Sequence, residues 1–348
     1  MPIVDIIGDI HGNVDKLRRL LGRLNYRENG GVYAHPERSA IFVGDLIDRG
    51  PAIGETLELV SAMIRSGSAQ IIMGNHEFNA LAFHTPDGKG GYLRRHTEKN
   101  CSQHSATLDY FQKNPNAAER ALTWFYSFPL WLDLGFARIV HAAWSASAIQ
   151  LLQTPYLNHD RLLRGSTKGT PEYDAIDTLL KGVEVRLPAG STFADKDAYL
   201  RAKIRVRWWL RRDPQGTIAE TVFPPDPSLP KIPFATATDW EPYGSDQPPV
   251  IFGHYWLPKD WPIRPLAPNV ICVDFSAGKG GPLVAYSLNP ERAEEPQIHK
   301  CRLTMAVIGL PLIAMISLAI QFTIAAGFVG NALSEYTRTH HVPAHSSH

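Results

Sequence analysis

The chain has 348 residues, of which 44% are hydrophobic, and it carries 35 Lys and Arg against 34 Asp and Glu. A hydrophobic fraction of this size is enough for one large core or two smaller ones. The near-zero net charge argues against broad binding of a nucleic-acid polymer, which needs a basic stripe that neutralises phosphates. The three cysteines lie far apart and form no Cys-x-x-Cys pair, which indicates a reducing compartment rather than a disulfide framework.

Strand-like and helix-like segments alternate over the first 145 residues. Near-continuous apolar runs predict buried strands at residues 2–9, 39–45 and 69–75. Apolar residues that recur on one face predict helices at 14–24 and 54–67. A hairpin is expected at 130–144, with its turn at Leu134 and Gly135. This alternation predicts an α/β fold.

The character of the chain changes between residues 153 and 249. Polar and charged residues with aromatic anchors come first, and a segment too rich in proline for regular structure follows. We interpret this part as an insertion that packs over one edge of the main domain and shapes its cleft. Strand-like runs return at residues 249–256, 269–276 and 281–289.

Each of the first three predicted strands ends in a polar motif that opens with glycine: GDIHG at Gly8, GDLIDRG at Gly44 and GNHE at Gly74. These motifs supply Asp9, His11, Asp45, Asp48, Asn75 and His76, and later strands add His141 and His254. Sites in open α/β sheets lie beyond the carboxyl ends of the strands, so we expect these side chains to meet. Carboxylates, imidazoles and one amide without a thiolate suit Mn, Fe or Zn, and the number of donors is enough for two ions.

Ordinary turn chemistry also places Asp, Asn and Gly at strand ends. The same pattern after three consecutive strands argues against coincidence. His141 taken alone would be interpreted as a core histidine, and it is assigned as a ligand because the other motifs need one. Glu77 is expected to be a structural acceptor in its loop. Four further histidines lack a comparable context and are expected to be surface or core residues: His35, His84, His96 and His104.

The order GDIHG, GDLIDRG and GNHE, followed by an isolated histidine and a Gly-His, resembles the phosphoprotein-phosphatase branch of the calcineurin-like metallophosphoesterases. That branch also includes the symmetrical bis(5'-nucleosyl)-tetraphosphatases. The sequence around the motifs is similar to that of a bacterial subgroup. The resemblance covers about residues 3–290. It implies a two-sheet sandwich flanked by helices (αββα), within a metallophosphoesterase domain at residues 1–300. Trp256 stands where related esterases outside this branch have a second histidine.

The resemblance also implies roles for these residues. Asp9 and His11 hold the first metal and Asp45 bridges. The second metal is completed by Asn75, His141 and His254. His76 is the general acid, oriented by Asp48, while Arg49 and Asn75 bind the substrate phosphate. A second arginine for the phosphate is expected from the insertion, with Arg207 preferred over Arg205. The alternative for this segment is a solvated basic strand whose tryptophans serve packing.

The implied reaction is hydrolysis of a phosphate ester by direct attack of metal-bound hydroxide, with two divalent ions and Mn favoured over Fe or Zn. We prefer a serine/threonine phosphoprotein phosphatase-like enzyme. Two alternatives are a symmetrical diadenosine tetraphosphatase and a catalytically idle, membrane-tethered scaffold. The expected partner is therefore a phosphorylated protein or a dinucleotide.

The segment from Leu303 to Ser334 contains no Asp, Glu, Lys, Arg or His. About 20 apolar residues in a helix span a bilayer, so we predict a transmembrane helix at 303–330 and a short polar tail at 331–348. Lys300 and Arg302 precede the run, and Arg338 is the only Lys or Arg after it. This excess of basic residues before the run favours a cytoplasmic catalytic domain anchored to the inner membrane. A C-terminal helix buried in the domain or in a dimer interface is the alternative.

Overall fold

The computed structural model describes residues 2–187, 192–194, 200–213, 215–226, 229, 233, 240–291 and 297–301. The predicted membrane helix at 303–330 and the tail at 331–348 lie outside these residues. Within the part of the chain that is described, no helix is long and apolar enough to cross a bilayer.

The first sheet contains the three N-terminal strands that the apolar runs predict. Its strand order is β15-β14-β1-β4-β5, with the bounds β1 (Ile3–Ile7), β4 (Arg38–Phe42), β5 (Ala69–Ile71), β14 (Leu283–Leu288) and β15 (Gln297–Cys301). β1, β4 and β5 run parallel, whereas β14 and β15 are antiparallel to their neighbours. The helices α1 (Val14–Arg23) and α2 (Ile53–Arg65) occupy the predicted crossovers and pack on this sheet.

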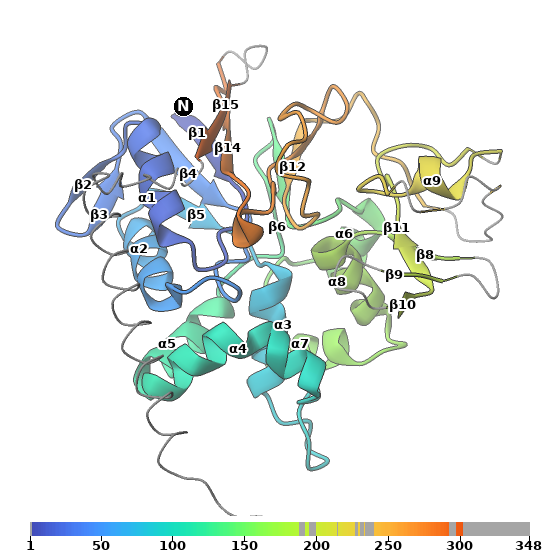
Figure 1. Ribbon diagram of the computed structural model, residues 1–348, viewed down its shortest axis with the longest axis horizontal. Helices are drawn as coiled ribbons and strands as arrows, with labels where there is room; N and C mark the ends of the chain where they lie inside the picture. The colour runs from blue at the N-terminus through green and yellow to red at the C-terminus, as the bar shows by residue number, and fades with distance from the viewer. Residues whose placement is uncertain are drawn as a thin grey trace, which may run out of the picture. The chain divides into compact units, whose positions relative to one another are not determined.

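The second sheet has the order β13-β12-β7-β6. Its strands are β6 (Trp131–Asp133), β7 (Arg138–Val140), β12 (Val250–Phe252) and β13 (Val270–Cys272). β6 and β7 form the expected hairpin, and β7, β12 and β13 run parallel. Figure 1 shows this sheet between the first sheet and two helices on its other side, α6 (Ala146–Leu152) and α8 (Pro171–Lys181). Residues of both sheets share one hydrophobic core.

Further helices follow β5 and β7, and the sequence analysis did not assign them. They are α3 (Asn75–His84), α4 (Glu98–Lys113), α5 (Pro115–Phe125) and α7 (His159–Ser166). α7 and α8 show that the start of the predicted insertion is regular. Short elements make up the remainder: β2 (Arg27–Asn29), β3 (Val32–Ala34), β8 (Glu184–Arg186), β9 (Phe193–Ala194), β10 (Leu200–Arg201), β11 (Lys203–Arg205), α9 (Ile218–Thr221) and the 3-10 turn Ala277–Lys279.

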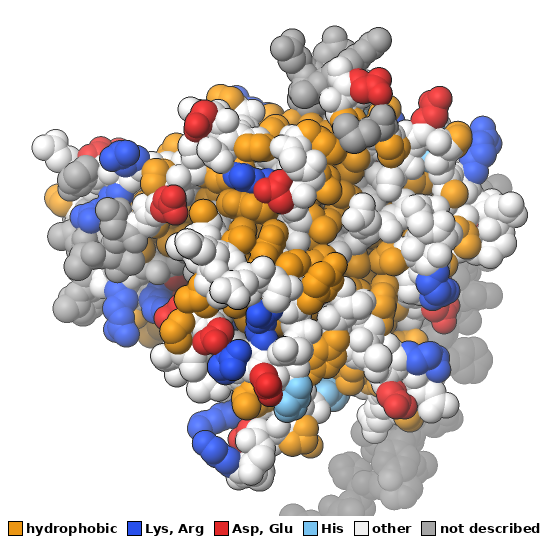
Figure 2. All heavy atoms as spheres, turned by 180° about the vertical axis from the view of Figure 1, so that it is seen from behind, with side chains coloured by type: hydrophobic (Ala, Val, Ile, Leu, Met, Phe, Trp, Pro, Cys, Tyr) orange, Lys and Arg blue, Asp and Glu red, His pale blue; other side chains and the backbone are white. Residues whose placement is uncertain are grey.

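One face of the molecule shows how charge is spread. In Figure 2, Lys and Arg side chains alternate with Asp and Glu side chains around hydrophobic ones, without a region of a single sign. This distribution agrees with the balance of 35 basic and 34 acidic residues.

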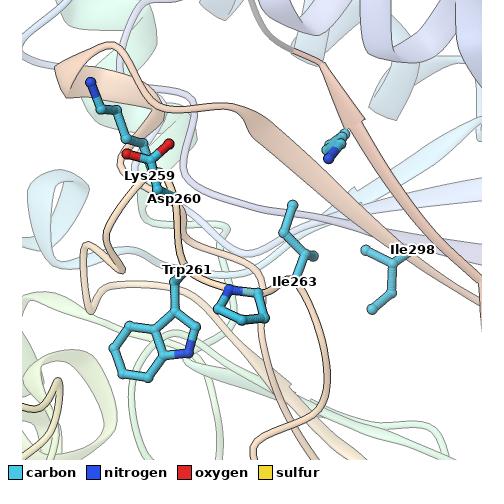
Figure 3. Close-up of a pocket in the computed structure, with 7 residues that line it drawn as sticks. Lys259, Asp260, Trp261, Ile263 and Ile298 are labelled. Carbon is cyan, nitrogen blue, oxygen red and sulfur yellow. The ribbon is translucent and has the colours of Figure 1, made fainter.

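A surface hollow of about 420 Å3 lies between the loop that follows β12 and the edge strand β15. Figure 3 shows Trp261 and Ile263 of the loop on one side and Ile298 of β15 on the other, with Lys259 and Asp260 close by. None of the predicted site residues lines this hollow. The predicted chemistry is therefore located elsewhere in the fold.

Candidate metal centre

The predicted ligands gather where parallel strands of the two sheets end. Asp9 and His11 follow β1, Asp45 follows β4, and Asn75 begins α3 directly after β5. His141 follows β7 and His254 follows β12 in the second sheet. All of these side chains are buried. Parallel strands deliver their carboxyl ends to the same edge, and this topology brings together residues that are far apart in the sequence.

Unusual backbone geometry accompanies this convergence. Five site residues have a positive φ, between 48° and 72°: His11, Asp45, Asp48, Arg49 and His254. Such conformations cost about 1–3 kcal/mol each outside glycine, and they persist where the surrounding fold imposes them. The turns therefore bend the chain so that successive polar side chains reach one point.

Asp45 lies at the centre of the cluster. Its Oδ2 is 3.6 Å from His11 Nε2 and 3.4 Å from His141 Nε2. The same oxygen is 3.9 Å from His76 Nε2. Two groups of donors could each hold a metal ion, namely His11 with Asp45 and His76, and Asp9 with Asp45 and His141. Asp45 belongs to both groups, which is the geometry that a bridging carboxylate needs.

The second part of the cluster is arranged around Asn75. Its Oδ1 lies 2.7 Å from His254 Nδ1 and 3.2 Å from His141 Nε2. The grouping of donors differs in two details from the roles that the resemblance implies. Asp9 groups with His141 rather than with His11, and His76 has a ring nitrogen within reach of the first group.

Several donor atoms in the cluster are buried and make no hydrogen bond with any described residue. They are Asp9 Oδ1, His11 Nε2 and Asp45 Oδ2. A buried polar atom without a partner is destabilising, by about 1–3 kcal/mol and more for a charged group. Divalent cations would satisfy these atoms, and an oxygen and nitrogen donor set without sulfur suits Mn, Fe or Zn. The residues present therefore fit a metal centre.

The other ring nitrogens orient two of the histidines. His11 Nδ1 donates to Ile47 O at 2.8 Å, and His141 Nδ1 donates to Val43 O at 2.7 Å. With Nδ1 of each ring bonded to a carbonyl, Nε2 faces Asp45 and is the ring atom that would bind a metal ion. Hydrogen bonds of this kind fix the tautomer of metal-binding histidines. Each backbone carbonyl comes from the β4 end, so this segment positions ligands of both sheets.

The charges of the cluster act strongly on one another. Burial alone would raise the pKa of Asp45, but His141 and His76 hold it well below its usual range. Burial, together with the nearby Asp274, raises the pKa of Asp9. Burial and the neighbouring His76 lower the pKa of His11 to about 4, which keeps its Nε2 available as a ligand.

A second hydrogen-bonded group borders the ligands. Asp48 accepts from His76 Nδ1 at 2.5 Å, from His104 Nδ1 at 2.7 Å and from Thr107 Oγ1 at 2.5 Å. The contact between Asp48 and His76 is the one that a carboxylate orienting a general acid requires. Burial alone would lower the pKa of His76, but the carboxylates of Asp45 and Asp48 raise it overall. A protonated His76 can donate from Nε2.

Arg49 and Trp256 lie at the edge of the cluster. The Trp256 ring stacks on His11 with 4.9 Å between centroids, and the Arg49 guanidinium carbon lies 5.3 Å from the same ring. Arg49 therefore lies close to the ligands, where a phosphate-binding arginine is expected. Trp256 supports both the ligand His11 and this arginine through ring contacts.

Among the described residues, no hydrogen bond or ion pair brings the Arg207 side chain to the cluster. Its backbone N–H donates to Thr221 O, and within the described residues no hydrogen bond or ion pair joins its side chain to the six ligands. Arg205, the other candidate, lies in β11 with Nε 3.9 Å from Glu184 Oε1. The second phosphate-binding arginine stays a prediction.

The sequence analysis missed three residues that contact this site. His104 and Thr107 lie on α4 and reach Asp48 across more than fifty positions of sequence, so no local pattern announces them. Asp274 is different, because it follows the strand β13 as the recognised carboxylates follow theirs. Its Oδ2 accepts from Trp256 N at 2.6 Å, and its charge acts on Asp9. The strand-end rule could have found it.

Glu77 has the structural role expected from the sequence. Its carboxylate accepts from the backbone N–H groups of Asp45 at 2.9 Å and Leu46 at 2.8 Å. These bonds hold the turn after β4 against the start of α3. Burial and the adjacent Asp45 raise the pKa of Glu77 to about 7.

Part of the chain is similar in sequence to several bis(5'-nucleosyl)-tetraphosphatases. The asymmetrical bis(5'-nucleosyl)-tetraphosphatase PrpE of Halalkalibacterium halodurans is 48% identical over 73 residues, which is 21% of this chain and 30% of that protein. PrpE of Anoxybacillus flavithermus is 31% identical over 147 residues, covering 40% and 57%. A symmetrical bis(5'-nucleosyl)-tetraphosphatase of Psychromonas ingrahamii is 32% identical over 125 residues, covering 36% and 37%. The chain thus spans between about a third and just over half of these relatives.

Among solved structures, a cold-active protein-tyrosine phosphatase of a psychrophilic Shewanella is similar over 87% of this chain and 81% of its own. The sequence identity is 16% and the TM-score is 0.44, a level of similarity that carries no conclusion about function. The family of calcineurin-like phosphoesterases matches residues 3–155. That range contains GDIHG, GDLIDRG, GNHE and His141. The chain therefore carries, at residues 3–155, a calcineurin-like phosphoesterase domain.

Proposed function

We propose that this protein hydrolyses phosphate ester or anhydride bonds with the help of two divalent metal ions, and that its substrate is a dinucleoside polyphosphate. The observation that carries the proposal is the cluster around Asp45, where buried donor atoms without hydrogen-bond partners face one another. Such atoms are costly unless cations bind there. Bound there, two divalent ions supply a nucleophilic water at neutral pH and neutralise charge on phosphoryl oxygens.

The protein's own residues supply the remaining functions. Arg49 lies over the Trp256 ring, which stacks on His11. In this place it binds the non-bridging oxygens of the phosphate and orients the phosphate toward the cluster. His76 donates the proton at Nε2 to the leaving oxygen while Asp48 holds Nδ1. The carboxylates of Asp45 and Asp48 raise the pKa of His76, which favours the protonated ring that a general acid needs.

The relatives support one of the two substrate classes over the other. The sequence analysis favoured a phosphoprotein, but the relatives named above are bis(5'-nucleosyl)-tetraphosphatases, of both the asymmetrical and the symmetrical kind. A dinucleoside polyphosphate presents anhydride bonds with a good leaving group to the same catalytic arrangement. We therefore place dinucleotides before phosphopeptides. Mn remains our first choice of metal on the basis of the donor set.

A comparison of substrates tests this function. Purified protein with added Mn is given diadenosine tetraphosphate, phosphoserine and phosphothreonine peptides, and p-nitrophenyl phosphate, and the products are quantified by chromatography. We expect the highest kcat/KM for diadenosine tetraphosphate. A higher value for a phosphopeptide would reinstate the phosphatase interpretation.

The variant Asp45→Asn separates catalysis from an idle scaffold. The substitution removes charge from the carboxylate that both donor groups share. We expect turnover to fall by more than the roughly 10–100-fold that loss of a residue supporting a ligand usually costs. Bound metal, measured by mass spectrometry, should also fall. Wild-type protein that binds no divalent ion and shows no turnover would support the scaffold.

A further inference from the structure

One face of α3 runs from the metal cluster into a separate pocket. Asn75, Phe78, Asn79 and Ala82 are spaced so that they lie on the same side of the helix. Asn75 belongs to the ligand cluster, and the other three line a pocket of about 150 Å3. One helical turn is about 5.4 Å long, so the pocket begins about one turn beyond the ligands.

The opposite walls of this pocket come from the ends of α7 and from α8. α7 packs against both α3 and α8, and Figure 1 shows the three helices as neighbours. Gly165 allows the close approach, because a Cβ at that position would lie 2.5 Å from Ile176 Cδ1. The floor is apolar, with Phe78, Ile176 and Leu180.

Polar groups border the apolar floor. Asn79, Ser166 and Tyr173 line the pocket, and Ser166 Oγ is buried without a hydrogen-bond partner among the described residues. Lys168, Lys181 and Asp177 also line it, and Asp177 forms an ion pair with Lys181, so Lys168 and Arg94 are the cations of the lining without such a partner among the described residues. Apolar and aromatic side chains with a few hydrogen-bonding groups are the usual lining of a small-molecule site, and they suit a heteroaromatic ligand.

Arg94 connects this pocket to the catalytic group. Its guanidinium donates to Asn79 Oδ1 at 3.1 Å and to Gln103 Oε1 at 3.3 Å, and no carboxylate of the described residues forms an ion pair with it. Burial lowers the pKa of Arg94, whereas Asp48 and Tyr173 raise it, so both lie within electrostatic reach. A partly buried guanidinium bonded only to amide oxygens retains the capacity to bind an anion.

We propose that this pocket binds the nucleoside monophosphate end of a nucleotide substrate, with the base on the apolar floor and the adjacent phosphate on Arg94. The proposal rests on the function proposed above and names the part of the protein that selects a nucleotide. It accounts for one face of α3 carrying both a metal ligand and the pocket wall. A substrate spanning both sites would have one phosphate at Arg49 and a more distant one at Arg94.

Binding of adenosine monophosphate tests the pocket without catalysis. Metal-free protein in a chelator is titrated with the nucleotide by calorimetry, using wild type, Arg94→Gln and the control Arg95→Gln. Arg95 is the exposed neighbour of Arg94 and does not line the pocket. We expect Arg94→Gln to weaken binding about tenfold or more, the size of one charge-assisted phosphate contact, and the control to bind as wild type does.

A second variant guards against a folding defect. Ser166→Met places a larger side chain in the pocket from its rim, and it should weaken binding by a similar factor while the far-ultraviolet circular dichroism stays unchanged. Wild-type protein that fails to bind adenosine monophosphate would overturn the proposal. So would equal affinity in wild type and Arg94→Gln, or an equal loss in Arg94→Gln and the control.

Kinetics distinguish the pocket from the chemistry. With Mn present, Arg94→Gln should lose at least about tenfold more kcat/KM toward diadenosine tetraphosphate than toward p-nitrophenyl phosphate, mainly through KM. Equal losses on both substrates would show that Arg94 acts through Asp48 and would overturn the pocket. If wild type hydrolyses neither substrate, the proposed function fails, and the titration still decides whether the pocket binds a nucleotide.

Discussion

Asp48 links two residues of α4 to His76. The carboxylate accepts hydrogen bonds from two imidazoles, His76 and His104, and from the hydroxyl of Thr107. Thr107 Oγ1 also accepts from the backbone N–H of Asp48 at 3.0 Å. With one oxygen held by α4, the other is fixed in the direction of His76. We infer that His104 and Thr107 position His76, the proposed general acid, through Asp48.

The variant His104→Ala tests this positioning. A hydrogen bond to a charged group contributes about 1.5–3 kcal/mol, so its loss should lower kcat about 10–100-fold while KM changes little. His104→Asn, which retains a donor, should recover part of the rate. His159→Ala is the control, because His159 is exposed at the start of α7. A kcat of His104→Ala equal to that of wild type would contradict the inference.

At the scale of elements, the strand-end turns depend on glycines that let backbones touch. Gly44 lies two residues beyond the end of β4 with φ +90°, and a Cβ there would lie 2.3 Å from the backbone nitrogen of Gly74. Gly253 is equally restricted, since a Cβ would lie 2.0 Å from Asp9 Oδ1. The turns after β4 and β5 therefore pack backbone against backbone, and Gly253 leaves room for the Asp9 carboxylate. Larger residues would separate the donors that these turns carry.

We expect Gly44→Ala to destabilise the fold and Gly22→Ala to stabilise it. The first substitution combines an unfavourable φ with a backbone clash, which together cost at least about 1–3 kcal/mol. The second lies within α1 with no atom within 4 Å of the new Cβ, so it should contribute about 0.5–1 kcal/mol. Urea unfolding measures both. Equal stability of the two variants would contradict the role of Gly44.

At the scale of the whole molecule, the cluster joins the two sheets. Asp9 and Asp45 come from the first sheet, and His141 and His254 come from the second. Asp274 adds a third buried carboxylate from the end of β13, close enough to raise the pKa of Asp9. Buried like charges repel and lose hydration, so cations at this place stabilise the contact between sheets.

Metal should consequently raise the melting temperature. A ligand present at 100 times its Kd adds about 2.7 kcal/mol, and for a chain of this size each kcal/mol corresponds to about 1.5 °C. Adding Mn to chelator-treated protein should therefore raise Tm by about 4 °C in calorimetry. Asp45→Asn should lose most of the shift. An equal shift in both proteins would indicate that Mn acts elsewhere.

The membrane anchor remains a prediction from the sequence, because its residues lie outside those that the structure describes. A chain ending at Arg302 should be recovered in the soluble fraction, whereas the full chain should need detergent, since a span of about 20 apolar residues inserts into the bilayer. Membrane flotation of both forms measures the difference. Recovery of the full chain without detergent would remove the anchor from our interpretation.

Much of the candidate site is visible in the sequence because its motifs are local. Asp9 and His11, or Asn75 and His76, lie within a few residues of a strand end, and period-two or turn geometry predicts where they point. The hairpin and the three parallel strands are local as well, being short apolar runs bounded by glycine and polar residues. The sequence by itself thus determined the set of candidate donors, the positions of the core strands along the chain and the family resemblance.

Only the tertiary structure decided how the pieces meet. His104 reaches Asp48 from the helix α4, and Arg94 reaches the α3 pocket from a loop. The sequence patterns of this helix and this loop do not point to either contact. Their roles come from contacts between segments distant along the chain, set by how helices pack on one another rather than by local propensity. The grouping of Asp9 with His141 is of the same kind. The residues next to a strand end determine where that strand ends. Which residues meet across the core depends on how all the elements pack together.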